Sequence, residues 1–196
     1  MRTLLSGLVV VLVASWAGAE DKKLDLFPLV QGTKWEYDVS VSGQSKDVIQ
    51  EVTKITAGKK GERDMVTLTT KVDEQSIVEE MSADEKAVYR HAFMSMKLET
   101  PLTILKYPFK AGTKWKETIK IAKEEAVANF EMLKVEEVKV VAGKYTAYPV
   151  LMEMETMGQK VTSKNWYVDG IGIVKQEVEF PGVKVTMELK KFTKGK

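Results

Sequence analysis

Hydrophobic and polar residues alternate along much of the chain. Between residues 34 and 41, Trp, Tyr and Val occupy every second position, and charged residues or Ser lie between them. The same two-residue period recurs in residues 148–156 and 183–189. Because successive side chains of a β-strand point to opposite faces, this period predicts strands with one buried face.

Less regular apolar runs, separated by turn residues, predict further strands. The turn signals include Ser42-Gly43, Ala142-Gly143 and Pro181-Gly182. The additional strands are expected at 46–56, 64–73, 75–82, 86–93, 114–121, 126–141, 160–168 and 173–180. About ten or eleven strands joined by short turns indicate an all-β fold, an antiparallel meander forming a curved sheet or a partly open barrel.

Two segments do not fit this pattern. In residues 126–141, Ala126, Val127 and Phe130 have helical spacing, so one short helix is an alternative to a strand. Residues 94–112 are apolar and contain Pro101 and Pro108. They predict an extended crossover instead of a regular strand. We expect it to lie across the mouth or open face of the sheet, as a lid or a core plug.

Residues 166–175, Trp-Tyr-Val-Asp-Gly-Ile-Gly-Ile-Val-Lys, predict a strand, a tight turn and a second strand. Gly170 follows Asp169, and this pair favours a turn in which glycine adopts a positive φ. Gly172 is expected to allow a bulge or a close approach of another group.

The N-terminus has the pattern of a secretory signal peptide over residues 1–19. Arg2 is its only charged residue, Leu4 to Val13 is almost entirely apolar, and Ala17-Gly18-Ala19 forms a cleavage site. A flexible lead-in is expected at 20–26 and a single β domain at 27–193. We therefore expect a periplasmic or secreted protein without a stable membrane anchor after cleavage.

Composition narrows the functional classes. The chain has no Cys, which excludes disulfides and attachment of a lipid to cysteine. Its 30 basic and 28 acidic residues are interspersed, without the basic block typical of nucleic-acid binding. His91 is the only histidine, so a metal site built on several His or Cys ligands is excluded.

Catalysis and cofactor binding are poorly supported. His91 has no nucleophile elbow near it in the sequence, and we interpret it as a strand or surface residue. The stretch Gly170-Ile171-Gly172 lacks the third glycine of a dinucleotide-binding loop. We expect no enzymatic activity, no cofactor and no bound metal.

Aromatic residues and methionines are the best candidates for a binding role. Large aromatic side chains at strand starts and bends fill cores more often than they contact ligands. Methionines also line adaptable apolar cavities, and Met152 and Met154 share one strand face. The candidate ligand-binding residues are Trp35, Trp115, Trp166, Met152, Met154, Leu102 and Leu105.

Four segments together resemble a known protein family. They are a Pro-x-x-x-Gly-x-x-Trp motif at Pro28–Trp35 and again at Pro108–Trp115, Val140–Tyr145, and Trp166–Lys175. The chain resembles a family of small secreted bacterial proteins that carry a domain of unknown function. The resemblance implies an all-β fold similar to the curved sheets of periplasmic lipoprotein carriers, and it implies no catalytic residues.

Two functional hypotheses follow. The first is non-catalytic binding of an apolar small molecule, or of a partner that presents an apolar group, inside or across the curved sheet. The second is a structural or protein-interaction module of the cell envelope with a filled core. A cavity above about 300 Å³ would favour the first hypothesis.

Overall fold

The computed structural model describes residues 23–121, 124–156 and 158–196. The predicted signal peptide at 1–19 and residues 20–22 of the lead-in lie outside the described residues. Thirteen strands make up the described fold. They are β1 (Lys34–Val41), β2 (Gln44–Thr56), β3 (Met65–Val72), β4 (Gln75–Ala83), β5 (Ala87–Phe93), β6 (Met96–Lys106), β7 (Lys114–Ile121), β8 (Glu124–Met132), β9 (Glu136–Val140), β10 (Gly143–Thr156), β11 (Gln159–Val168), β12 (Gly172–Phe180) and β13 (Val183–Thr193).

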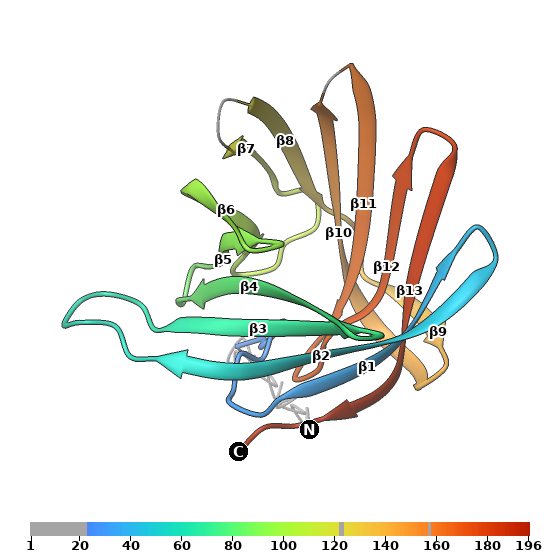
Figure 1. Cartoon of the computed structure of the whole chain (residues 1–196). Coiled ribbons are helices and arrows are strands. Elements are labelled where there is room, and N and C mark those ends of the chain that lie inside the picture. Colours follow the sequence, from blue (N-terminus) through green and yellow to red (C-terminus); the bar gives the residue numbers. More distant parts are fainter. Residues whose placement is uncertain (1–22, 122–123, 157) are drawn as a thin grey trace, which may run out of the picture.

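The strands form one antiparallel sheet that curls into a partly open barrel (Figure 1). The strand order is β6-β5-β4-β3-β2-β1-β13-β12-β11-β10-β8-β7, and β9 pairs with β10. The first and last strands, β1 and β13, pair with each other, so they lie side by side in the middle of the strand order. The predicted all-β meander is confirmed, with more strands than the ten or eleven expected.

Two sequence expectations about individual segments are wrong. Residues 96–106 of the expected crossover form β6, a strand that pairs with β5 with two register shifts. Pro101 is tolerated there because β6 is an edge strand and because this proline lies in the register shift between the Arg90–Leu102 and Ala92–Lys97 pairs. The expected single element at 126–141 is two strands, β8 and β9, and the helical alternative is wrong. The chain turns between them, where the Leu133 N–H donates to the Pro149 carbonyl at 2.9 Å.

The meander gives the barrel two different ends. Consecutive strands run in opposite directions, so alternate turns lie at the same end of the barrel. The end that we call the open end carries the hairpin turns β1–β2, β3–β4, β5–β6, β10–β11 and β12–β13. The longer connections gather at the other, which we call the closed end. In Figure 1 the hairpin tips surround the opening of the curled sheet.

The closed end is filled by a packed aromatic and aliphatic core. Its largest fully buried side chains include Trp35, Tyr37 and Tyr167. Phe27 lies between two of them, with ring centroids 6.2 Å from Trp35 and 6.2 Å from Tyr167. Leu26, at the end of the expected flexible lead-in, is itself fully buried in this core. The segment before β1 therefore plugs the closed end.

The turn after β11 holds this plug in place. Gly170 has a φ of 72°, as predicted, and its N–H donates to the Asp25 carbonyl at 2.8 Å. The Asp25 N–H donates to the Asp169 Oδ1 at 2.9 Å. Gly172 has a φ of 98°, and a Cβ there would lie 3.3 Å from the Trp35 Nε1. Both glycine predictions are confirmed, because the second position brings the backbone against the core tryptophan.

Candidate functional site

Apolar side chains surround the open end on the inner face of the sheet. Residues paired directly across antiparallel strands point to the same face, so the strand registers show which side chains face inward. Five large apolar residues beside the hairpin turns face inward and are between 39% and 46% exposed. We call them the rim: Val41, Phe93, Met96, Phe180 and Val183.

The registers place each rim residue on the inner face. Val41 continues the alternation that begins at the buried Tyr37, and it pairs with Val185. Phe180 pairs with Val183 across the β12–β13 hairpin. Phe93 pairs with Met96 across the β5–β6 hairpin. The rim therefore draws on three hairpins that lie far apart in the sequence.

The β5–β6 hairpin has a strained turn. Met94 and Ser95 have φ values of 50° and 63°, in the left-handed region that non-glycine residues rarely adopt. Two such residues in succession match the type I′ geometry of tight hairpins. The Ser95 N–H donates to the Val78 carbonyl at 3.0 Å, which ties the turn to β4. The turn holds Phe93 and Met96 side by side at the rim.

Polar side chains lie on the inner face between the rim and the closed-end core. Gln176 donates to the Asn165 Oδ1 at 2.6 Å. Ser163 is buried and lies on the same strand face as Asn165. On β4 and β5, Glu79 and Arg90 form an ion pair with 3.2 Å between the carboxylate oxygen and Nε. The inner face thus combines apolar and hydrogen-bonding groups.

Met152 and Met154 lie on this inner face, as their shared strand face predicted. Met152 pairs with Phe130 of β8, and Met154 pairs with Ala128. The ring of Phe130 stacks on Trp115 of β7, with centroids 4.9 Å apart and planes 5° from parallel. The structure therefore brings together Trp115 and Met152 through Phe130.

Leu102 and Leu105 lie on β6, next to the point where the two sheet edges meet. Leu105 is fully buried opposite Val88 of β5. The Trp115 indole N–H donates to the Thr103 carbonyl at 2.9 Å and so connects β7 to β6. The segment is therefore a strand of the wall beside Trp115 and not a crossover.

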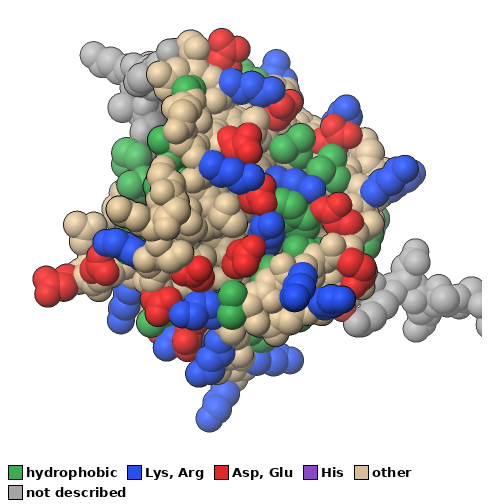
Figure 2. All heavy atoms as spheres, turned by 90° about the vertical axis from the view of Figure 1, so that its right-hand side faces the viewer, with side chains coloured by type: hydrophobic (Ala, Val, Ile, Leu, Met, Phe, Trp, Pro, Cys, Tyr) green, Lys and Arg blue, Asp and Glu red, His purple; other side chains and the backbone are tan. Residues whose placement is uncertain are grey.

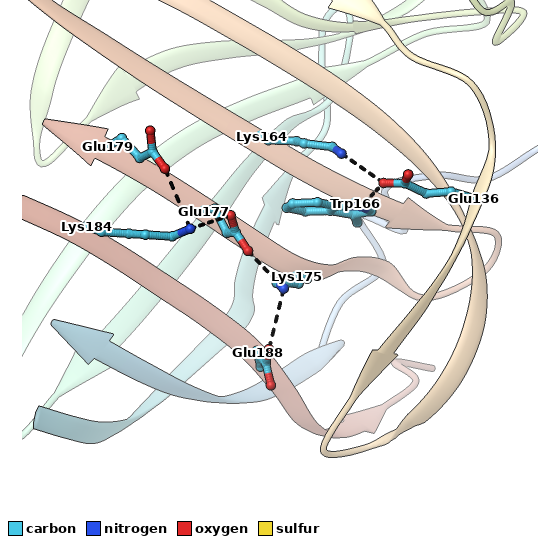
Figure 3. A network of polar contacts seen from close by, with 8 residues as sticks. All are labelled: Glu136, Lys164, Trp166, Lys175, Glu177, Glu179, Lys184 and Glu188. Carbon is cyan, nitrogen blue, oxygen red and sulfur yellow. Dashed lines mark hydrogen bonds and ion pairs between the residues drawn. The ribbon is translucent and has the colours of Figure 1, made fainter. Parts of the chain in front are cut away.

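Trp35 and Trp166 lie apart from the other candidates. Trp35 is buried at the closed end, where its indole N–H donates to the Ile171 carbonyl at 2.5 Å. Trp166 lies on the outer face, between the ammonium groups of Lys164 and Lys175 (Figure 3). Its indole N–H donates to Glu136 at 2.6 Å. Neither tryptophan is near the rim.

The outer face around Trp166 carries a charge network. A hydrogen bond of 2.8 Å from Lys164, together with the Trp166 indole N–H, holds the pKa of Glu136 below its ordinary value. Lys175 lies 2.9 Å from Glu177, which also contacts Lys184 at 2.9 Å (Figure 3). Figure 2 shows positive and negative side chains intermixed on the neighbouring surface. Such partly exposed surface pairs contribute about 0–1 kcal/mol each.

Two surface hollows lie over β7, β8 and β10. Their volumes are about 320 Å³ and about 620 Å³. The first is bordered by charged side chains that include Lys114, Glu131 and Glu153. The second shares Glu153 and adds Glu155 and Lys160. Because charged side chains border both hollows, neither is the apolar cavity that would favour the first hypothesis.

The described residues contain no group of three or more His, Asp or Glu side chains that could hold a metal ion. His91 is half-buried, and its Nε2 lies 2.7 Å from the Ser82 Oγ. Burial and the nearby Arg63 charge lower the pKa of His91. The absence of enzymatic activity stays a prediction. No helix in the described part of the chain has the length and apolar character needed to cross a membrane.

Sequence reasoning missed the rim and Arg90. The signal was present, since large apolar residues directly flank the turns at Val41-Ser42-Gly43 and Phe180-Pro181-Gly182-Val183. A residue beside a hairpin turn is usually solvated, so apolar residues repeated there indicate a shared surface. Nothing in the sequence distinguishes Arg90 from the charged residues of the outer face.

Comparison with known proteins supports the architecture. The sequence matches no protein-family model and no curated protein. Two solved structures are similar over 87% of this chain. A predicted lipoprotein from Parabacteroides distasonis has a TM-score of 0.58 at 14% identity, with 99% of its chain covered. A predicted exported protein with a YmcC-like fold from Bacteroides fragilis has a TM-score of 0.56 at 14% identity, with 100% covered. The chain is therefore similar in fold to these two bacterial proteins.

Proposed function

We propose that this protein binds an apolar small molecule, without catalysis, at the open end of the barrel. The observation that carries the proposal is the rim, whose five inward-facing apolar side chains are 39–46% exposed. Exposed apolar surface of this kind marks ligand-binding or interaction sites in soluble proteins. A ligand seated there would remove this surface from water, at about 25 cal/mol per Å².

The rest of the interior supports a site limited to the open end. Trp35, Tyr37 and Tyr167 fill the closed end, so a ligand has no space there. Met152 and Met154 are half-buried on the inner wall below the hairpins. Methionine side chains are flexible and polarisable, so they adapt to apolar ligands of different shapes.

We place the protein in the periplasm or in the secreted fraction. The N-terminal pattern of a signal peptide supports export, and the two similar structures are of a predicted lipoprotein and a predicted exported protein. The charge distribution argues against a nucleic-acid partner.

The second candidate is a structural or protein-interaction module of the cell envelope. The filled closed end favours it, because a core of this kind needs no ligand to complete it. In this case the rim would contact an apolar group on an envelope protein. The first candidate predicts that a small apolar molecule binds at the rim without a partner protein, and the second predicts that it does not.

A rim variant tests the proposal. We expect the double variant Phe180→Ser/Val183→Ser to bind a fluorescent fatty-acid probe about tenfold more weakly than the wild type, because it removes two apolar contacts. Fluorescence titration of the purified mature protein gives both dissociation constants. The matched control is Val135→Ser/Val141→Ser, which replaces two exposed valines on either side of β9. Equal weakening by both variants, or no saturable binding by the wild type, would contradict the proposal.

A further inference from the structure

We propose that the ligand is an acidic amphiphile, with its acidic headgroup bound by Arg90 inside the barrel and its chain lying along the rim. This inference rests on the function proposed above. The chemical class is a long-chain carboxylic acid or a molecule with an equivalent anionic headgroup. The headgroup would point inward, toward the closed end.

The strand registers place the Arg90 side chain inside the barrel. Arg90 pairs with Met81 of β4 and with Leu102 of β6, and both partners are buried. A second observation agrees. Burial raises the pKa of Tyr167, a core residue across the barrel, and the positive charge of Arg90 opposes this rise. The guanidinium thus lies close enough to the interior to act on a residue of the opposite wall.

The contact between Arg90 and Glu79 is incomplete. Their charged atoms are 3.2 Å apart, yet neither the Arg90 Nε nor the Glu79 Oε1 has a hydrogen bond of acceptable geometry among the described residues. Leaving buried charged groups without well-formed hydrogen bonds is costly. A guanidinium carries five N–H donors in a planar fork that matches a carboxylate, so a bound acid would add acceptors for this guanidinium beyond the single contact with Glu79.

Arg90 can be reached from the open end. Its side chain is 27% exposed, while that of Glu79 is only 7% exposed. An incoming headgroup therefore meets the cation before the carboxylate. The guanidinium lies 5.1 Å from the ring centroid of Phe93, a rim residue. A molecule bound to Arg90 would consequently have its chain beside Phe93 and Met96.

The test compares two competitors that differ only in the headgroup. Dodecanoic acid and dodecanol each displace a fluorescent apolar probe from the full mature protein at about pH 8, where the acid is ionised. We expect the wild type to bind the acid about tenfold more tightly than the alcohol, as a charge-assisted hydrogen bond provides. Arg90→Met should remove this preference, so that the variant binds the acid and the alcohol with about equal affinity.

Arg63→Met is the matched control. Arg63 bonds to Asp84 at 2.8 Å and lies over the Tyr89 ring on the outer side of β5. This variant should keep the preference for the acid. If Arg90→Met does not fold, Glu79→Gln serves as the test variant. Removing the carboxylate that competes for Arg90 should raise the preference for the acid over the alcohol about threefold.

The outcomes separate this inference from the proposed function. Equal binding of acid and alcohol by the wild type, or an unchanged preference in Arg90→Met, would overturn the headgroup assignment and leave apolar binding intact. An unchanged or lowered preference in Glu79→Gln would overturn it as well. Displacement by neither competitor would overturn both.

Discussion

Replacing Gly172 with valine is expected to lower the free energy of unfolding by about 2–6 kcal/mol. Two effects add. The φ of 98° belongs to a region that β-branched residues resist, at a cost of about 1–3 kcal/mol. The new Cβ would also lie 3.3 Å from the Trp35 Nε1 and 3.5 Å from the Pro28 Cδ, and such overpacking costs about 1–3 kcal/mol. Urea denaturation of the purified mature chain measures the change.

Gly170→Val is the matched control for this prediction. Gly170 has a φ of 72°, but a Cβ there meets no atom within 4 Å. This variant should therefore show only the backbone cost, about 1–3 kcal/mol. If both variants lost the same amount of stability, a side chain at position 172 would not be overpacked against Trp35, and the predicted close approach would be wrong.

Leu105→Ala is expected to destabilise the protein by about 2–5 kcal/mol. Leu105 is fully buried on β6, where truncation leaves a cavity among packed neighbours. This cost distinguishes a wall strand from a lid, because a lid residue that covers the opening loosely would tolerate the change. The shift of the denaturation midpoint, at constant slope, gives the magnitude.

Leu151→Ala provides the comparison for Leu105→Ala. Leu151 is half-buried on β10 and borders the outer hollow over β7 and β8. Its truncation should cost about 1 kcal/mol or less, since little apolar surface is lost from the interior. A smaller effect for Leu105 than for Leu151 would mean that β6 is not a part of the packed wall.

The alternation of side chains predicted most of the strands because it depends only on local geometry. In residues 34–41 the two faces are so different that one register alone buries Trp35 and Tyr37. The turns were predictable for the same reason, as the positive φ of Gly170 shows.

The two wrong predictions arose where tertiary context decides. Pro101 argued against a strand, but a proline is acceptable on an edge strand, and the sequence does not show which strand lies at the edge. In residues 126–141 the apolar spacing fitted both a helix and a strand. Pairing with β10 selected two strands, and the turn around Leu133 separates them.

The candidate site was only partly predictable from the sequence. Met152 and Met154 were found because a strand period places both on one face. Trp166 could not be assigned to a face, since its neighbour Tyr167 is also a large aromatic residue and the register with β12 shifts between the two. The rim depends on three hairpins that reach the same end of the barrel only in the folded sheet, so local patterns cannot reveal it.

Covalent mapping of a bound probe tests most directly whether the open end is the binding site. A fatty acid with a photoreactive group near the chain end is bound to the mature protein, activated by light and located by peptide mass spectrometry. We predict labelling of the hairpins that contain Phe93, Met96, Phe180 and Val183, and its loss when unlabelled fatty acid competes. Competable labelling confined to the outer hollow around Lys114 and Glu131 would contradict a ligand site at the open end.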